Sequence, residues 1–78
     1  MKEIYPLTAL KPEEWGVIKA ITAGSDIRRR LRDLGMIEGT KVECVFKSPG
    51  KDPVAYYVRG AVIALRNEDS DCIMISYM

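Results

Sequence analysis

The sequence contains no histidine and only two cysteines, Cys44 and Cys72, among its 78 residues. Without histidine, the chain lacks the side chain that most often acts as a general acid or base near neutral pH. No serine has an evident activating neighbour, and no glycine-rich phosphate-binding loop precedes a helical segment. We therefore expect no catalytic residues, no cofactor and no enzymatic activity.

The same scarcity bears on metal binding. Thiolate sites for zinc or iron take three or four ligands, which usually come as closely spaced cysteine pairs or together with histidine. Cys44 and Cys72 are isolated from each other in the sequence. We expect no metal site, and two reduced, mostly buried thiols rather than a disulfide.

Neither a charge excess nor a long apolar run is present. The chain has 12 lysines and arginines against 11 acidic residues, a net charge of +1, whereas nucleic-acid-binding domains usually carry a clear basic excess. No apolar run approaches the roughly 20 residues of a membrane span, and residues 1–21 lack the apolar centre of a signal peptide. We expect a cytoplasmic protein without nucleic acid that reaches a membrane only through a partner.

Short segments rich in β-forming residues alternate with glycine and proline. In a chain of this length they indicate a single domain over residues 1–78, mainly β, built as a small, partly open SH3-like barrel of about five strands. Leu7 and Leu10 are expected to reach back into its core. Strands are predicted at residues 15–21, 40–47 (with Val42, Cys44 and Phe46 on one face), 54–59, 61–65 and 72–77.

Residues 25–34 predict the one clear helix. Ser25 suits an N-cap, and an apolar stripe formed by Ile27, Leu31 and Leu34 would face the barrel. Gly35 can adopt the left-handed conformation that ends a helix, and Met36 would then pack on Leu31.

Four arginines cluster on this helix: Arg28, Arg29, Arg30 and Arg32. Helical spacing places Arg28 and Arg32 on one flank, Arg29 within reach of Asp33, and Arg30 beside the apolar stripe. Such a run is commonly a solvated face with a local salt bridge. Four neighbouring cations repel one another, however, and guanidinium groups favour bidentate contact with carboxylates or phosphates. We interpret the cluster as a site for binding a partner.

The pair Tyr56-Tyr57 is followed by Arg59. Neighbours on a strand point to opposite sides, so we expect one tyrosine inside and Tyr57 outside with Arg59. An exposed tyrosine beside arginine suits a contact with another molecule, although an ordinary aromatic on a barrel wall is equally consistent. The predicted partner-binding residues are Arg28, Arg29, Arg30, Arg32, Met36, Tyr57 and Arg59.

The segment 27–43 resembles the FeoA family. The shared features are the three arginines before Leu31, Leu34-Gly35-Met36, Gly39 and Val42, and the likeness continues at 52–54, 58–60 and 63–66. The resemblance implies an SH3-like barrel with the helix inserted after the first strand. It also implies a cytoplasmic accessory that binds the cytoplasmic region of FeoB, the membrane transporter of ferrous iron, and modulates it. An alternative is an iron-responsive sensor related to the SH3-like domain of metal-dependent repressors. Weak homo-oligomerisation is left open.

Overall fold

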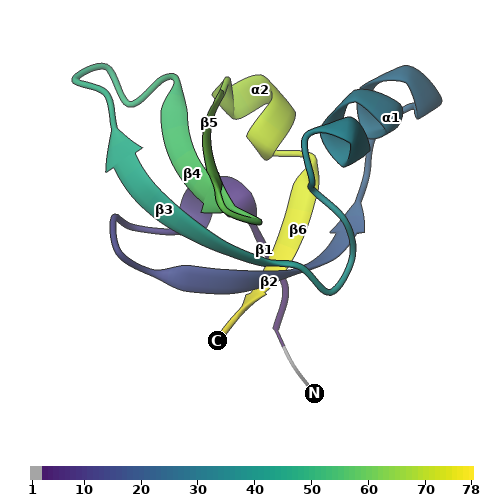
Figure 1. Cartoon of the computed structure of the whole chain (residues 1–78), viewed down its shortest axis with the longest axis horizontal. Helices are drawn as coiled ribbons and strands as arrows, with labels where there is room; N and C mark the ends of the chain where they lie inside the picture. The colour runs from purple at the N-terminus through teal and green to yellow at the C-terminus, as the bar shows by residue number, and fades with distance from the viewer. Residues whose placement is uncertain (1–2) are drawn as a thin grey trace.

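Six antiparallel strands form one strongly curled sheet in the computed structural model, which describes residues 3–78 (Figure 1). The sheet order is β1-β6-β2-β3-β4-β5. A 3₁₀ turn (η1, Leu7–Ala9) follows β1, and two helices complete the structure: α1 (Ser25–Asp33) and the short α2 (Asn67–Ser70). The strands are β1 (Tyr5–Pro6), β2 (Trp15–Ile21), β3 (Lys41–Lys47), β4 (Val54–Val58), β5 (Ala61–Leu65) and β6 (Ile73–Tyr77).

The expected mainly β, partly open barrel is confirmed, with two differences in its elements. Tyr5–Pro6 forms an additional two-residue strand on β6, and α1 consequently follows the second strand instead of the first. The short segment between β5 and β6, for which no element was predicted, forms the single helical turn α2. The first two residues of the predicted domain 1–78 lie outside the described range. Among residues 3–78, no helix has the length and apolarity needed to cross a bilayer.

The last strand lies between the first two. Ile75 of β6 is opposite Tyr5 of β1 on one side and opposite Ile18 of β2 on the other. Gly16 of β2 passes close to Ile75, because a Cβ placed there would lie 2.7 Å from the Ile75 Cδ1 atom. The two N-terminal strands are therefore held together through β6 rather than by direct pairing.

The inside of the curled sheet is filled by aliphatic side chains and Tyr56. Leu7 and Leu10 are fully buried in it, as expected. On β4, buried Val54, Tyr56 and Val58 alternate with more exposed neighbours, the two-residue period of a strand with one face inside. The buried apolar residues are Leu7, Leu10, Ile18, Leu31, Met36, Val42, Cys44, Val54, Tyr56, Val58, Leu65, Ile73 and Ile75.

The expected face of β3 is correct for Val42 and Cys44 and wrong for Phe46. The β3–β4 register shifts between Cys44 and Phe46. Such a bulge adds one residue to a strand and reverses the side to which the following residues point. Phe46 is consequently 59% exposed, while Cys44 is fully buried.

Helix α1 ends at glycine as predicted, but it begins differently. Its N-cap is Gly24, with no side-chain hydrogen bond, and Ser25 is its first helical residue. At its C-terminus Gly35 has a φ of +101°. The Gly35 N–H donates to the Arg32 carbonyl at 2.9 Å and the Met36 N–H donates to the Leu31 carbonyl at 3.0 Å. These two hydrogen bonds form a Schellman motif.

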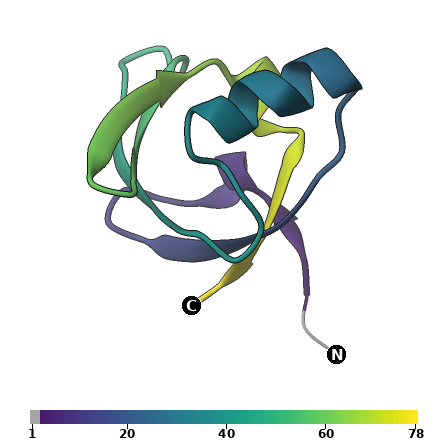
Figure 2. The ribbon, with the colours of Figure 1, turned by 45° about the vertical axis from the view of Figure 1, so that its right-hand side comes forward.

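The apolar stripe of α1 is only partly covered. Leu31 is fully buried, but Ile27 and Leu34 are 36% and 41% exposed. The helix lies along one rim of the barrel, at the upper right in Figure 2. It is therefore anchored chiefly by Leu31 and Met36, and most of its surface remains free.

Candidate functional site

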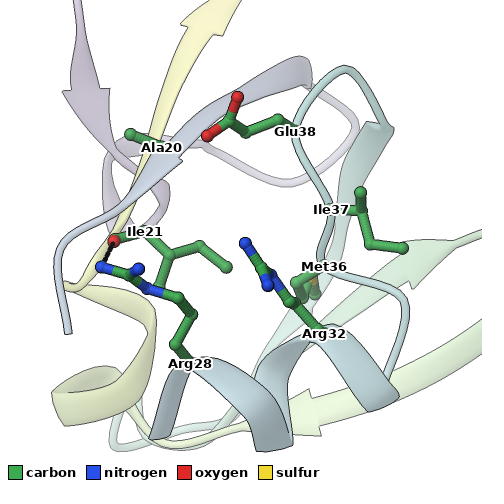
Figure 3. Close-up of a pocket in the computed structure, with 7 residues that line it drawn as sticks. All are labelled: Ala20, Ile21, Arg28, Arg32, Met36, Ile37 and Glu38. Carbon is green, nitrogen blue, oxygen red and sulfur yellow. Dashed lines mark hydrogen bonds between the residues drawn. The ribbon is translucent and has the colours of Figure 1, made fainter. Parts of the chain in front are cut away.

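A groove of about 450 Å³ separates α1 from the end of β2 (Figure 3). One wall comes from α1, and the opposite wall comes from β2 and from the turn that follows α1. The lining residues are Ala20, Ile21, Arg28, Arg32, Met36, Ile37 and Glu38.

Arg28 and Arg32 lie one helical turn apart and both line the groove, so the expected shared flank is observed. Arg28 is partly engaged within the chain, since its Nη2 atom donates to the carbonyl oxygens of Ile21 and Ala23, each at 3.4 Å. Arg32 extends from α1 into the groove (Figure 3), and its guanidinium makes no hydrogen bond or ion pair with residues 3–78. Its guanidinium donors are available to another molecule.

The remainder of the groove is largely apolar. Ile21 is half-buried, and Ile37 is 42% exposed. Among the groove-lining residues that the structure describes, Glu38 is the acidic one. Guanidinium groups beside an apolar floor can bind a carboxylate and at the same time cover a neighbouring apolar side chain.

Met36 was predicted both to pack on Leu31 and to contact a partner. The structure corrects the second prediction, because Met36 is fully buried. The Schellman motif directs the residue after Gly35 back over the helix, which is the reason for this burial. Met36 closes the bottom of the groove from within and has no surface of its own to offer.

Arg30 points away from the groove, toward α2. Its Nη2 atom lies 3.4 Å from Oδ1 of Asp69. This contact is the ion pair that the structure shows within residues 3–78. The expected pairing of Arg29 with Asp33 is not formed there. Arg29 lies instead on the outer surface of α1, beside a shallow depression that Arg28 and Arg32 also border. Asp69 is distant in sequence from α1, so helical spacing could not reveal this pair.

Tyr57 and Arg59 lie away from the groove. Tyr57 is on the outer face of β4, 37% exposed, with its ring centroid 6.2 Å from that of Trp15. Arg59 begins the two-residue turn between β4 and β5, and its side chain lies against Gly35. The predicted partner-binding residues are thus distributed over several surfaces, and the groove unites only Arg28 and Arg32 with buried Met36.

The cysteines are separate and unpaired. Burial raises the pKa of the Cys44 thiol, which keeps it protonated and makes it a poor metal ligand. Cys72 is half-buried, with its Sγ atom 3.6 Å from the Glu68 carbonyl oxygen. Over the described range, no group of three or more histidine, cysteine or acidic side chains is placed to hold a metal ion.

Comparison with known proteins identifies the fold and the family. The FeoA domain family matches residues 5–77. The chain is 26% identical to a FeoA-like protein from Clostridium acetobutylicum, with a TM-score of 0.91, covering 100% of this chain and 91% of that one. It is 30% identical to Stenotrophomonas maltophilia FeoA, a prokaryotic SH3 domain protein solved with zinc, with a TM-score of 0.79 and coverage of 90% and 87%.

A manganese-dependent transcriptional repressor has the same fold at 13% identity, with a TM-score of 0.89. The aligned region covers 100% of this chain and 44% of the repressor chain. None of the curated proteins matches the chain. The fold is therefore SH3-like, as expected. The FeoA family is an accessory of transport rather than an enzyme family, and its name implies a role in ferrous iron transport. Because the family match spans nearly all of the described residues, the chain belongs to the FeoA domain family.

Proposed function

We propose that this chain is an accessory of ferrous iron uptake that binds the cytoplasmic region of a FeoB-type transporter and modulates its activity. It acts in the cytoplasm and reaches the inner face of the membrane through this partner, without a nucleic acid or a cofactor. Residues 1–78 act as one FeoA-like domain. Membership of the FeoA family supports the link to ferrous iron transport.

The observation that carries the docking proposal is the guanidinium of Arg32, which has no partner among residues 3–78 and lies in a groove with an apolar floor. A hydrogen bond to a charged group is worth about 1.5–3 kcal/mol, and a guanidinium can make two such bonds to one carboxylate. Ile21 and Ile37 can cover an adjacent apolar side chain. The groove therefore suits a peptide segment that carries a carboxylate next to an apolar residue.

Modulation requires that the chain bind one conformation of the transporter better than another, since a ligand shifts an equilibrium only by its difference in affinity. The cytoplasmic region would present the groove-binding segment fully in one state and partly in the other. The direction of the effect on transport then depends on which of the two states is active.

Calorimetry with the isolated cytoplasmic region of the transporter tests the docking site. Arg32→Glu should weaken binding at least about tenfold, because it replaces attraction by repulsion at about 1.4 kcal/mol per decade. Lys11→Glu is the matched control: it makes the same charge change in the exposed turn before β2, away from the groove, and should leave the affinity unchanged. Equal affinities for both variants and the unaltered chain would remove the groove from the proposal.

An iron-responsive sensor is the second candidate, favoured by the shared fold with the manganese-dependent repressor. A titration with Fe²⁺ under reducing conditions, followed by NMR, separates the two functions. Specific shifts at the amides of Cys44 or Cys72 would favour the sensor. The accessory proposal expects no such shifts, because the protonated Cys44 thiol lacks neighbouring ligands among residues 3–78.

A further inference from the structure

The two edges of the sheet differ in how they are protected. At one edge β1 has only two residues, of which Pro6 lacks a backbone donor. At the other edge β5 runs over five residues, Ala61–Leu65, and pairs with β4 alone. Natural proteins usually shield such an edge with a short strand, proline or charged side chains. The β1 edge follows this rule and the β5 edge does not.

The register of the β4–β5 hairpin identifies the free backbone groups. Val58 is opposite Ala61 across a two-residue turn, in which Arg59 and Gly60 have φ values of +50° and +87°. This is the geometry of a type I′ turn, in which the closing pair is hydrogen-bonded. Hydrogen-bonded pairs then alternate along the ladder. The N–H and C=O groups of Val62 and Ala64 therefore point away from β4, and they have no partner within residues 3–78.

The side chains leave this edge open. Val62 is 60% exposed, Ala64 is exposed, and no residue from Ala61 to Leu65 is charged or a proline. Val62 also continues the outer face that carries Tyr57, its cross-strand partner. A strand added at this edge would thus gain backbone hydrogen bonds and an apolar surface beside them.

The charged residues nearest to β5 in the sequence are both positive. No acidic residue occurs between Asp52 and Glu68, whereas Arg59 precedes the strand and Arg66 follows it. We propose that the free edge of β5 binds an extended segment of another protein by β-strand addition, and that this segment has an apolar centre and acidic residues at its ends. The two arginines select the charge, and the groups of Val62 and Ala64 form the hydrogen bonds.

A second copy of the chain is disfavoured at this edge in one of the two-fold pairings that use the free groups. That pairing of β5 with itself is centred on Ile63. It would bring Arg66 of each copy beside Arg59 of the other, and like charges on facing strands repel. The inference concerns a surface separate from the groove between α1 and β2, so it stands independently of the proposed docking site.

NMR titration of the isotope-labelled chain with two synthetic heptapeptides tests the proposal. Both alternate valine and threonine; one carries glutamate at each end and the other carries lysine. The glutamate peptide should shift the amides of Val62 and Ala64 and should bind at least about fivefold more tightly than the lysine peptide. Unchanged amides with both peptides, or equal affinity for the two, would overturn the proposal.

Substitutions in the chain give an independent reading. Ala64→Pro removes an outward N–H group that is not hydrogen-bonded to β4. This substitution should weaken binding of the glutamate peptide at least about fivefold, the equivalent of one hydrogen bond. Ala64→Val retains the N–H and is the matched control. If Ala64→Pro fails to fold, Arg66→Glu still tests the proposal. It should abolish the preference for the glutamate peptide over the lysine peptide. An unaltered preference would refute the role of charge.

Two further measurements separate this site from its alternatives. Arg32→Glu should leave peptide binding unchanged, so failure of the groove proposal does not affect the result. Sedimentation of the chain without peptide should show no dimer formed through the β5 edge. Such a dimer would be recognised by its loss in the Ala64→Pro variant. Such a dimer would mean that the occupant of the β5 edge is a second copy, and the proposal of an acidic partner segment would be wrong.

Discussion

The Arg59 side chain lies across Gly35, so that a Cβ added at Gly35 would be 3.3 Å from Cδ of Arg59. This contact joins the β4–β5 turn to the C-terminal end of α1. Glycine is needed at position 35 for two reasons: its φ is +101°, and the arginine side chain approaches its Cα closely. The contact thus connects the C-terminal end of α1 to a turn that lies beyond β3 and β4 in the sequence.

Alanine substitution at two glycines separates backbone strain from contact. Gly39→Ala should cost about 1 kcal/mol of unfolding free energy, since Gly39 has a φ of +87° but no atom within 4 Å of its added Cβ. Gly35→Ala should cost more, roughly 2 kcal/mol, because Arg59 must also move. Denaturant unfolding measures both values. Adding Arg59→Ala to Gly35→Ala should return the loss to the Gly39 level; an unrelieved loss would show that the contact is energetically neutral.

Gly16 is expected to be intolerant of any side chain. A Cβ there would lie 2.7 Å from Ile75 Cδ1 and 3.2 Å from the Ser76 carbonyl oxygen. Gly16→Ala should destabilise the chain by about 1–3 kcal/mol through overpacking. Ile75→Val removes the clashing methyl and alone should cost about 0.5–1.5 kcal/mol. The double variant should lose less than the sum of the two, and a strictly additive result in thermal unfolding would contradict the clash.

Tyr56 should make the chain sensitive to alkaline pH. Burial raises the pKa of its phenol to about 12 from the ordinary value of 10.0. Between these values the unfolded chain loses the proton and the native chain keeps it, so the unfolding free energy falls as pH rises, by at most about 2 kcal/mol. Stability is unaffected by this group below pH 10.

Tyr56→Phe isolates the effect from the titration of lysines. The Tyr56 hydroxyl faces the buried Ser70 hydroxyl without a hydrogen bond of good geometry within residues 3–78, so its removal near pH 7 should change the unfolding free energy by no more than about 1 kcal/mol. From pH 10 upward the variant should lose stability less steeply than the unaltered chain in parallel denaturant titrations. Parallel losses in the two proteins would exclude Tyr56 as the cause.

The bulge in β3 predicts opposite results at two neighbouring sites. Phe46→Ser should change the unfolding free energy by no more than about 0.5 kcal/mol, because Phe46 is largely exposed. Cys44→Ser should cost about 1–3 kcal/mol, since it places a hydroxyl in the fully buried position. Equal losses in chemical denaturation would place both side chains on the same face, as a regular strand would.

Local patterns were sufficient to predict most elements of the fold. The strands over 15–21 and 61–65 were predicted with their observed bounds, and Gly35 ends α1 by the expected motif. These features depend on alternation and on the conformational freedom of glycine, both of which are encoded by adjacent residues. The two-residue strand β1 was missed because its pairing partner is β6, at the far end of the sequence.

The candidate site was harder to predict than the fold. Helical spacing correctly placed Arg28 and Arg32 on one flank, but it could not show that Arg30 pairs with Asp69 or that the groove is completed by β2. The burial of Met36 followed from the Schellman motif, which the sequence did contain. The Phe46 bulge has no signature in alternation, because a register shift depends on the neighbouring strand.

The place of β6 between β1 and β2 has a consequence for the order of folding. Nearly the whole chain must be available before the N-terminal strands can be joined, because the strand that links them comes last. Contacts between distant parts of a sequence slow the search for the native state, and barrels of this kind typically fold in milliseconds to seconds. Nascent chains that lack Ile73–Tyr77 would leave β2 unpaired on one side, so productive folding must follow the synthesis of this segment.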